Sequence, residues 1–177
     1  LAFETDPSTI DERAVELPLL KADFPPDDIA RVLAEAKAQD VSARRPGDLV
    51  VGADQVLEFE GARLTKPEDM EAARRQLLAM SGKRHELHSA VTLARDGETL
   101  WSHVGTVRLQ MRAFGPAFVG HYLAKAGDVI LSSVGAYQLE GPGIQLFDTI
   151  EGDYFTVLGL PMLPLLAELR ALGEIEA

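Results

Sequence analysis

The sequence contains no cysteine, and this absence excludes several kinds of chemistry. Without thiolates the protein can form no disulfide bond, cysteine-ligated zinc site, iron–sulfur cluster or cysteine nucleophile. The lack of cysteine also fits a reducing compartment, and we expect a cytoplasmic location. No uncharged apolar run approaches the roughly 18 residues that a membrane-spanning helix needs, so no membrane partner is expected.

Positive charge is scarce as well. Lys and Arg number 17 against 28 Asp and Glu, for a net charge of −11. Nucleic-acid-binding proteins usually carry a basic surface, so we expect no nucleic acid polymer as partner. A polyanionic substrate could bind only where local cations or a metal ion offset the repulsion. The 177 residues are 46% hydrophobic, and without repeats or linkers they predict one domain over residues 1–177.

Hydrophobic spacing and turn residues predict a mixture of helices and strands. Helices are expected after Pro25-Pro26 as far as Asp40, after Pro67 as far as Ser81, over 116–125 and after Pro161. Strands are expected over 49–51, 56–59, 84–95, 98–112, 144–150 and 154–157. Asp96-Gly97, between the two long strands, is typical of a β-hairpin turn. This mixture favours an α/β or α+β fold over a simple βαβ arrangement.

Two residues have positions that suit a catalytic or ligand-binding site. Asp54 follows the apolar strand 49–51, with the small residues Gly52 and Ala53 directly before it. A carboxylate at a strand end is a common metal ligand or catalytic base, but an aspartate that simply starts a turn is the more usual case. Lys66 stands just ahead of a predicted helix N-terminus, where a cation and backbone N–H groups suit an anion. A solvated loop lysine is the alternative.

A glycine-rich segment, Gly135–Gly143, is a second candidate for ligand binding. Its glycines permit close backbone approach, and Gln138 and Glu140 could read the hydrogen-bonding edge of a ligand. A hairpin with a bulge is the alternative, and no Gly-Lys-Ser/Thr follows to make a P-loop. Asp11 and Glu12, in a segment expected to be extended, could join a metal site.

The histidines and serines point to no familiar hydrolase site. The four histidines, at positions 85, 88, 103 and 121, lack the helical spacing of a zinc protease. His85 and His88 are expected on a strand surface. No Gly-x-Ser-x-Gly motif is present, which argues against a serine hydrolase.

Several segments together match a known family in order and spacing. They are Val50–Leu57 (VVGADQVL), Leu64–Pro67 (LTKP), Gln76–Gly82 (QLLAMSG), Gly135–Tyr137 (GAY) and Gly152–Pro161. Across essentially its whole length the chain resembles the Maf-like nucleoside triphosphate pyrophosphatases. The resemblance implies an elongated, curved mixed sheet flanked by helices, as in the inosine triphosphate pyrophosphatase group, with the active site in a central cleft. It also implies a divalent metal cation (Mg²⁺, with Mn²⁺ or Co²⁺ as alternatives), cleavage between the α- and β-phosphates, and a homodimer.

The resemblance also implies roles for individual residues. Asp54 matches the family's proton acceptor, Lys66 the lysine of its Gly-Lys-Pro motif, Lys37 a helix lysine and Glu12 an N-terminal acid. Asp54 and Glu12 are the expected metal ligands. Two lysines and a metal would neutralise the triphosphate while a carboxylate activates water, which makes chemical sense of the set.

Departures from the family pattern bear on the substrate. Gln55 replaces the threonine of the branch that prefers dTTP and UTP, and Gln138-Leu-Glu140 replaces its Gly-Ile-Gln-Gly motif. These three residues, as expected nucleobase contacts, are closer to the branch acting on 7-methyl-GTP. The family's N-terminal strand and arginine-rich phosphate loop would precede Leu1, and we expect such a segment in the full protein.

The sequence therefore predicts a nucleoside triphosphate pyrophosphatase that forms a nucleoside monophosphate and pyrophosphate, with 7-methyl-GTP as one candidate substrate. A dTTP- or UTP-preferring enzyme of the same family is one alternative. A non-catalytic nucleotide-binding or cell-division regulatory protein is another.

Overall fold

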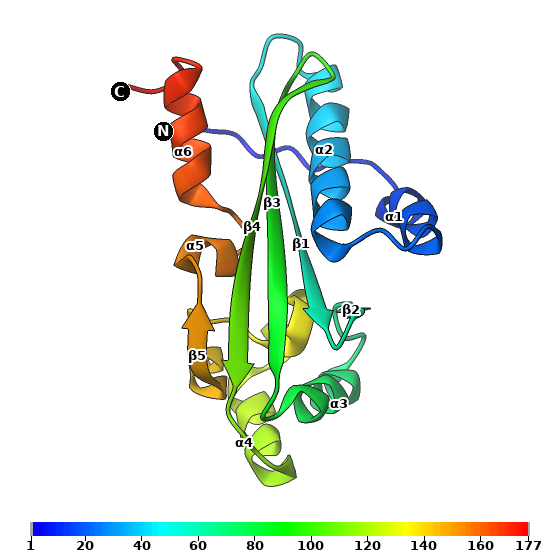
Figure 1. Ribbon diagram of the computed structural model, residues 1–177, viewed down its shortest axis with the longest axis vertical. Helices are drawn as coiled ribbons and strands as arrows, with labels where there is room; N and C mark the ends of the chain where they lie inside the picture. Colours follow the sequence, from blue (N-terminus) through cyan, green and yellow to red (C-terminus); the bar gives the residue numbers. More distant parts are fainter. Residues whose placement is uncertain (1, 177) are drawn as a thin grey trace. The chain divides into compact units, whose positions relative to one another are not determined.

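The computed structural model describes residues 2–176, and Figure 1 labels its helices and strands. The helices are α1 (Glu12–Lys21), α2 (Pro26–Arg44), α3 (Met70–Met80), α4 (Pro116–Ala126), α5 (Tyr154–Val157) and α6 (Met162–Ala171). The strands are β1 (Val50–Phe59), β2 (Ala62–Leu64), β3 (Arg84–Arg95), β4 (Glu98–Met111) and β5 (Phe147–Glu151). They form one sheet in the order β2-β1-β3-β4-β5, in which β2 is antiparallel to β1 and β5 to β4. The predicted mixed helix–strand class is confirmed.

The chain divides into two compact units. Unit 1 contains the described residues up to Gln55, then His88–Gly105 and the residues from Gly159 onward. Unit 2 contains Val56–Leu87 and Thr106–Leu158. The single domain over residues 1–177 and the central cleft stay predictions. Of the helices within residues 2–176, none is long and apolar enough to cross a membrane.

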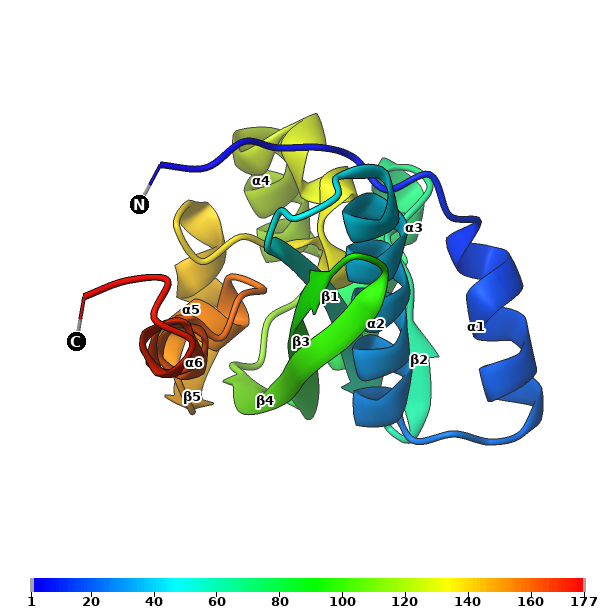
Figure 2. The same cartoon turned by 90° about the horizontal axis from the view of Figure 1, so that it is seen from above.

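In unit 1, helix α2 packs closely against the first half of β1 (Figures 1 and 2). Pro26 suits the first turn of α2 because its missing N–H has no helical partner to lose. Gly52 of β1 explains the close packing: a Cβ there would lie 2.6 Å from Ala34 O and 2.8 Å from Ala38 N. Since real Cβ atoms do not approach backbone so closely, only glycine allows this contact. The helix surface that includes Lys37 is thereby brought close to the strand.

The β3–β4 hairpin of unit 1 confirms the prediction made from Asp96-Gly97. Asp96 has φ 53° and Gly97 φ 82°, and two positive φ values in succession are what a tight hairpin turn requires. The turn is held to the end of α2 and the loop after it. Gly97 N donates to Ser42 Oγ at 3.0 Å, and Gly47 N donates to Asp96 Oδ1 at 2.7 Å.

Unit 2 has an extensive hydrophobic core. Helix α3 begins at an aspartate cap, where Ala72 N donates to Asp69 Oδ1 at 2.6 Å. The helix buries Ala73, Leu77 and Met80, which share one face at helical spacing. The core draws on β1, β3, β4, α3 and α4 and on the segment before β5, and includes Leu57, Leu77, Met80, Leu87, Leu109, Met111, Val119, Tyr122, Ile130 and Leu146.

Two predictions for the C-terminal third were wrong in detail. Tyr154–Val157, predicted as a strand, is helix α5. Asp153 caps this helix, accepting hydrogen bonds from Thr156 N at 2.9 Å and Thr156 Oγ1 at 3.1 Å, and so outweighs the strand preference of the aromatic and β-branched residues. The strand predicted over 144–150 begins only at Phe147, because the residues before it form a short 3₁₀ helix.

The local structure around two candidate residues also differs from the prediction. β1 continues unbroken over Val50–Phe59, so Asp54 lies within the strand and neither ends it nor starts a turn. Glu12 is the first residue of α1 and not part of an extended segment. Asp11 caps that helix, with its Oδ1 accepting from Ala14 N at 3.1 Å.

Candidate active site

Three of the predicted residues come together in unit 1. Lys37 Nζ lies 2.7 Å from Asp54 Oδ1 and 3.0 Å from Glu12 Oε1. They come from three elements, since Glu12 opens α1, Lys37 lies midway along α2 and Asp54 lies within β1. The Asp54 side chain is 9% exposed, that of Lys37 21% and that of Glu12 56%. The cluster therefore runs from the buried strand to solvent.

The environment keeps Lys37 positively charged. Burial lowers the pKa of the Lys37 amine, but the hydrogen bond and charge of Asp54, followed by those of Glu12, outweigh it and leave the pKa above its usual value. With both carboxylates ionised, the three side chains together carry one net negative charge. A triphosphate would be repelled by that charge, so binding calls for a further cation.

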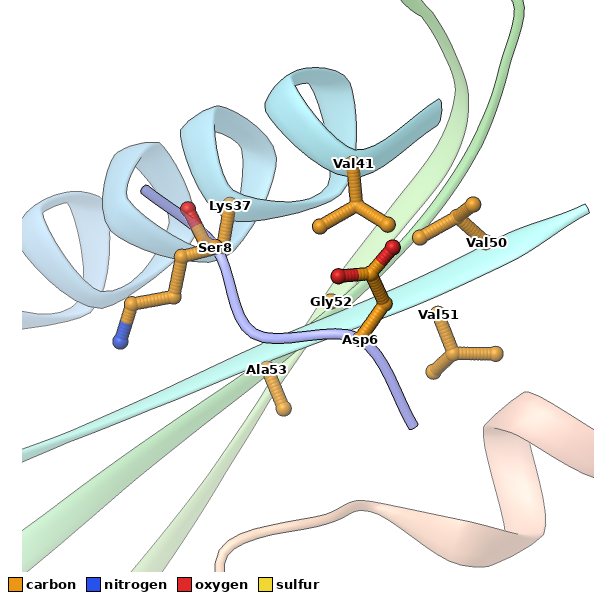
Figure 3. Close-up of a pocket in the computed structure, with 8 residues that line it drawn as sticks. All are labelled: Asp6, Ser8, Lys37, Val41, Val50, Val51, Gly52 and Ala53. Carbon is orange, nitrogen blue, oxygen red and sulfur yellow. The ribbon is translucent and has the colours of Figure 1, made fainter. Parts of the chain in front are cut away.

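A small pocket of unit 1 adjoins this cluster (Figure 3). Its lining comes from the N-terminal segment, α2 and β1: Asp6, Ser8, Lys37, Val41, Val50, Val51, Gly52 and Ala53. Lys37 thus belongs both to the ion-pair cluster and to the pocket wall. Asp6 and Ser8 could not be predicted from the sequence, because their place here depends on contacts with distant residues.

The N-terminal segment is fastened to α2 by specific bonds. Asp40 Oδ2 accepts from Thr9 N at 2.8 Å and from Ser8 Oγ at 3.1 Å. Arg45 Nε donates to Asp6 Oδ2 at 2.9 Å. The hydrogen bond from Arg45 holds the pKa of Asp6 below its usual value, and that from Thr9 N does the same for Asp40. These contacts fix the chain just ahead of Glu12.

Gln55 follows Asp54 along β1 and makes its own contact in unit 1. Its Nε2 donates to Ser89 Oγ on β3 at 2.8 Å. Successive side chains of a strand point to opposite faces of the sheet, so the side chains of Asp54 and Gln55 lie on different faces. The role of Gln55 in nucleobase contact stays a prediction.

Lys66 lies in unit 2, between β2 and α3, and is exposed. The backbone before it is fixed, because Gln76 Nε2 of α3 donates to Thr65 O at 2.8 Å. Pro67, directly after it, is buried. An anchored backbone with an exposed ammonium group is suited to phosphate binding, and this role stays a prediction.

Gln138 and Glu140 also lie in unit 2, within the glycine-rich segment. Gln138 is half-buried, and its Nε2 donates to Ser133 Oγ at 3.2 Å. Glu140 is exposed. The segment is built of short 3₁₀ turns and is not the bulged hairpin considered as the alternative.

Oxygen donors for a metal are present at the Lys37 cluster. Asp54 and Glu12 each direct one carboxylate oxygen at the same nitrogen, Lys37 Nζ. Carboxylate oxygens are hard ligands of the kind that Mg²⁺ prefers, and in this structure one oxygen of each residue is bonded to the Lys37 ammonium group.

The two histidines expected on a strand surface are buried. His85 is 2% exposed and His88 6%, so that prediction was wrong. The alternating pattern of β3 could not reveal it, since residues on both faces of this strand are covered.

Comparison with known proteins agrees with the motif pattern. Residues 1–172 match a family model described as "Maf-like protein". The chain is 59% identical over 170 residues to a "7-methyl-GTP pyrophosphatase" of Brucella suis biovar 1 (strain 1330), covering 96% of this chain and 85% of that protein. A protein of the same name from Mesorhizobium japonicum is 57% identical, with 99% and 88% covered. A "Nucleoside triphosphate pyrophosphatase" of Paramagnetospirillum magneticum is 48% identical, with 99% and 90% covered.

Proposed function

Since the chain belongs to the Maf-like protein family, we propose that it is a nucleoside triphosphate pyrophosphatase. It cleaves the bond between the α- and β-phosphates and releases a nucleoside monophosphate and pyrophosphate. The observation that carries this proposal is the convergence of Asp54 and Glu12 on Lys37 Nζ. Within a chain that matches the family over its length, it supplies a carboxylate base, a fixed cation and oxygen ligands at one place.

Asp54 is the proposed proton acceptor for the attacking water. Its placement within a strand restricts the backbone, and its bond to Lys37 orients the carboxylate and favours the charged form. A carboxylate held in this way can accept a proton from water or orient it for attack on phosphorus.

Lys37 is the proposed phosphate contact. An ammonium group has three N–H donors, and its two contacts with Asp54 and Glu12 leave one for a phosphate oxygen. Lys66, exposed ahead of α3, is proposed to neutralise further phosphate charge. Both lysines act on charge that grows in the transition state, where such stabilisation is most effective.

We propose Mg²⁺ as the cofactor, with Mn²⁺ or Co²⁺ as alternatives, and Asp54 and Glu12 as its ligands. A divalent ion supplies Lewis-acid stabilisation of the phosphate oxygens and reverses the net negative charge of the cluster. Chelation with EDTA should abolish pyrophosphate release, and added Mg²⁺ should restore it. Full release after exhaustive chelation would contradict the metal requirement.

For the substrate, we propose 7-methyl-GTP in preference to dTTP or UTP. Similar proteins carry that name, and Gln55, Gln138 and Glu140 depart from the pattern of the pyrimidine branch. Glu140 can accept hydrogen bonds from the donor edge of a purine, whereas an amide can serve as donor or acceptor. A higher kcat/KM with dTTP or UTP would show this assignment to be wrong.

A cytoplasmic homodimer is the proposed state of the enzyme. On α5 and the residue after it, Tyr154 is 50% exposed, Phe155 40% and Leu158 42%. Large apolar side chains gathered on one surface are typical of protein–protein contacts. Light scattering of the full-length protein should give twice the chain mass, and a monomer at all concentrations would contradict the proposal.

The test of the function is a nucleotide panel with Mg²⁺ and the full-length protein. Canonical and methylated triphosphates are incubated, and pyrophosphate and orthophosphate are measured separately. Pyrophosphate with the matching monophosphate is expected. Orthophosphate alone would indicate cleavage at another bond, and binding without any cleavage would identify a non-catalytic nucleotide-binding or cell-division regulatory protein instead.

A further inference from the structure

His85 and Tyr137 form a buried hydrogen-bonded pair in unit 2. His85 Nε2 lies 2.8 Å from the Tyr137 hydroxyl, and the two residues are 2% and 5% exposed. Phe147 packs against both rings, with centroid distances of 5.9 Å to His85 and 4.9 Å to Tyr137. His85 Nδ1 is buried and has no hydrogen-bond partner among residues 2–176. Its bond to Tyr137 is therefore the polar contact that fixes the ring.

The pair joins two neutral groups at physiological pH. Burial lowers the pKa of His85 to about 4. Burial also raises the pKa of Tyr137. A hydrogen bond between neutral groups in a dry environment is lost only when one of them is removed or the local structure opens.

Tyr137 follows a turn of unusual backbone conformation. Gly135 and Ala136 have φ of 78° and 58°, and the second value is uncommon for alanine. A Cβ on Gly135 would lie 2.7 Å from Tyr137 Cε1, so the tyrosine ring packs directly on that glycine. The Tyr122 hydroxyl donates to Ala136 O at 3.1 Å. Such a turn persists only when its surroundings hold it, and the two tyrosines supply the bonds.

Gln138 comes directly after Tyr137, and its backbone is held by close neighbours. Gly141 N donates to Gln138 O at 3.2 Å. A Cβ on Gly143 would lie 2.8 Å from Gln138 N, so that glycine also packs against this peptide. The Gln138 side chain is oriented by its bond to Ser133 Oγ. Phe147 of β5 and Leu57 of β1 pack against this segment, and the His85–Tyr137 bond adds a buried hydrogen bond that links it to β3.

We propose that His85 is a positioning residue that sets nucleobase selectivity: through its hydrogen bond to Tyr137 it holds residues 135–143 in one conformation and so places Gln138. This inference rests on the proposed function, because selectivity presupposes turnover. His85 touches no substrate in this role. His85 acts through the conformation of residues 135–143. Its loss leaves the Gln138 side-chain amide present but less well oriented.

The test uses four variants of the full-length protein. His85→Phe and Tyr137→Phe remove the bond and retain a ring, His85→Gln keeps a group that can reach the Tyr137 hydroxyl, and the double Phe variant tests coupling. The ratio of kcat/KM for 7-methyl-GTP to that for dTTP should fall about threefold to tenfold in each single Phe variant, which is the size of one lost hydrogen bond. It should fall no further in the double variant. His85→Gln should recover most of the ratio, and the change should lie in KM with kcat nearly constant.

Thr92→Val is the matched control. It removes another hydroxyl contact, the partly buried one between Thr92 Oγ1 and Ser102 Oγ at 2.9 Å, from unit 1. Melting of this variant should resemble that of Tyr137→Phe, and its selectivity should equal that of the wild type. Equal loss of selectivity in Thr92→Val would show that the effect is a general consequence of lower stability and overturn the inference.

Amide hydrogen exchange provides a readout that does not depend on activity. The Gly141 amide, bonded to Gln138 O, should exchange faster in Tyr137→Phe and at the wild-type rate in Thr92→Val. Unchanged exchange, or faster exchange with unchanged selectivity, would overturn the inference. If the wild-type protein hydrolyses no nucleotide, the proposed function is wrong and the selectivity role falls with it, while the exchange data still decide whether His85 positions this segment.

Discussion

Lys37 Nζ lies 2.7 Å from Asp54 Oδ1 and links helix α2 to strand β1. The same nitrogen reaches Glu12 at 3.0 Å, so one cation connects three elements of unit 1. The Asp54 carboxylate is mostly buried, and a buried carboxylate is stable only with a partner for its charge. Lys37 therefore has a structural role besides the catalytic role proposed for it, and experiments can separate the two.

Replacement of Lys37 by Met removes the charge and keeps most of the length. We expect kcat/KM to fall by about a hundredfold or more, the usual effect of losing one transition-state contact. The free energy of unfolding should fall by about 1–3 kcal/mol, because Asp54 loses its ammonium partner. Pyrophosphate release and urea denaturation measure the two effects. Arg31→Met is the control, since it removes a surface cation from the same helix; an equal activity loss in both variants would contradict a specific role for Lys37.

Gly52→Ala tests the close packing of α2 on β1. The new Cβ would meet Ala34 O and Ala38 N at 2.6 and 2.8 Å, and neither backbone atom can move alone. We expect a destabilisation of about 1–3 kcal/mol and a lower kcat, because the helix that carries Lys37 must shift. Gly115→Ala adds the same methyl group where nothing lies within 4 Å and should change little. Thermal melting and an activity assay measure the two effects. Wild-type stability and kcat in Gly52→Ala would show that α2 can shift at little cost.

The pH dependence of stability should report the burial of His85. Its pKa is lowered from 6.5 to about 4 in the folded protein. Between these values the unfolded chain binds more protons, so the free energy of unfolding falls as the pH falls through this window. The loss is about 3 kcal/mol at roughly 1.4 kcal/mol per pH unit. His85→Phe lacks this contribution, and its stability should approach or pass that of the wild type towards pH 4. The free energy of unfolding of both proteins is measured by urea denaturation across this pH window. An equal fall in the two proteins would contradict the claim that His85 is buried in its neutral form.

Helices, strands and turns were predictable where the preferences of neighbouring residues determine the local conformation. Asp96-Gly97 favours a tight turn through its own backbone preferences, and the hairpin formed as expected. Tyr154–Val157 shows the limit, because its residue types favour a strand while the cap from Asp153 starts a helix. Helix α1 was not predicted, and Pro18 lies inside it, where a proline disfavours a helix.

The candidate site was predictable only in part, for a physical reason. Asp54 and Lys66 stood out by their local setting, but nothing in the spacing of Glu12, Lys37 and Asp54 indicates that they meet. The family resemblance selected these three residues, and the structure brings them together within unit 1. The prediction that His85 lies on a strand surface was wrong, because its burial depends on Tyr137 and Phe147, which lie far along the chain.

Asp54→Asn is the most direct test of the proposed activity. The change keeps shape and volume and removes the charge and most of the basicity. We expect kcat for pyrophosphate release to fall about 10²- to 10⁴-fold, while the melting temperature stays the same or rises, because active-site charges are often held at a cost in stability. Asp96→Asn, the same change in the hairpin turn, should leave both unchanged. A folded Asp54→Asn variant that keeps most of its kcat would contradict the assignment of Asp54 as the base, and loss of activity through unfolding would show that Asp54 is a structural residue.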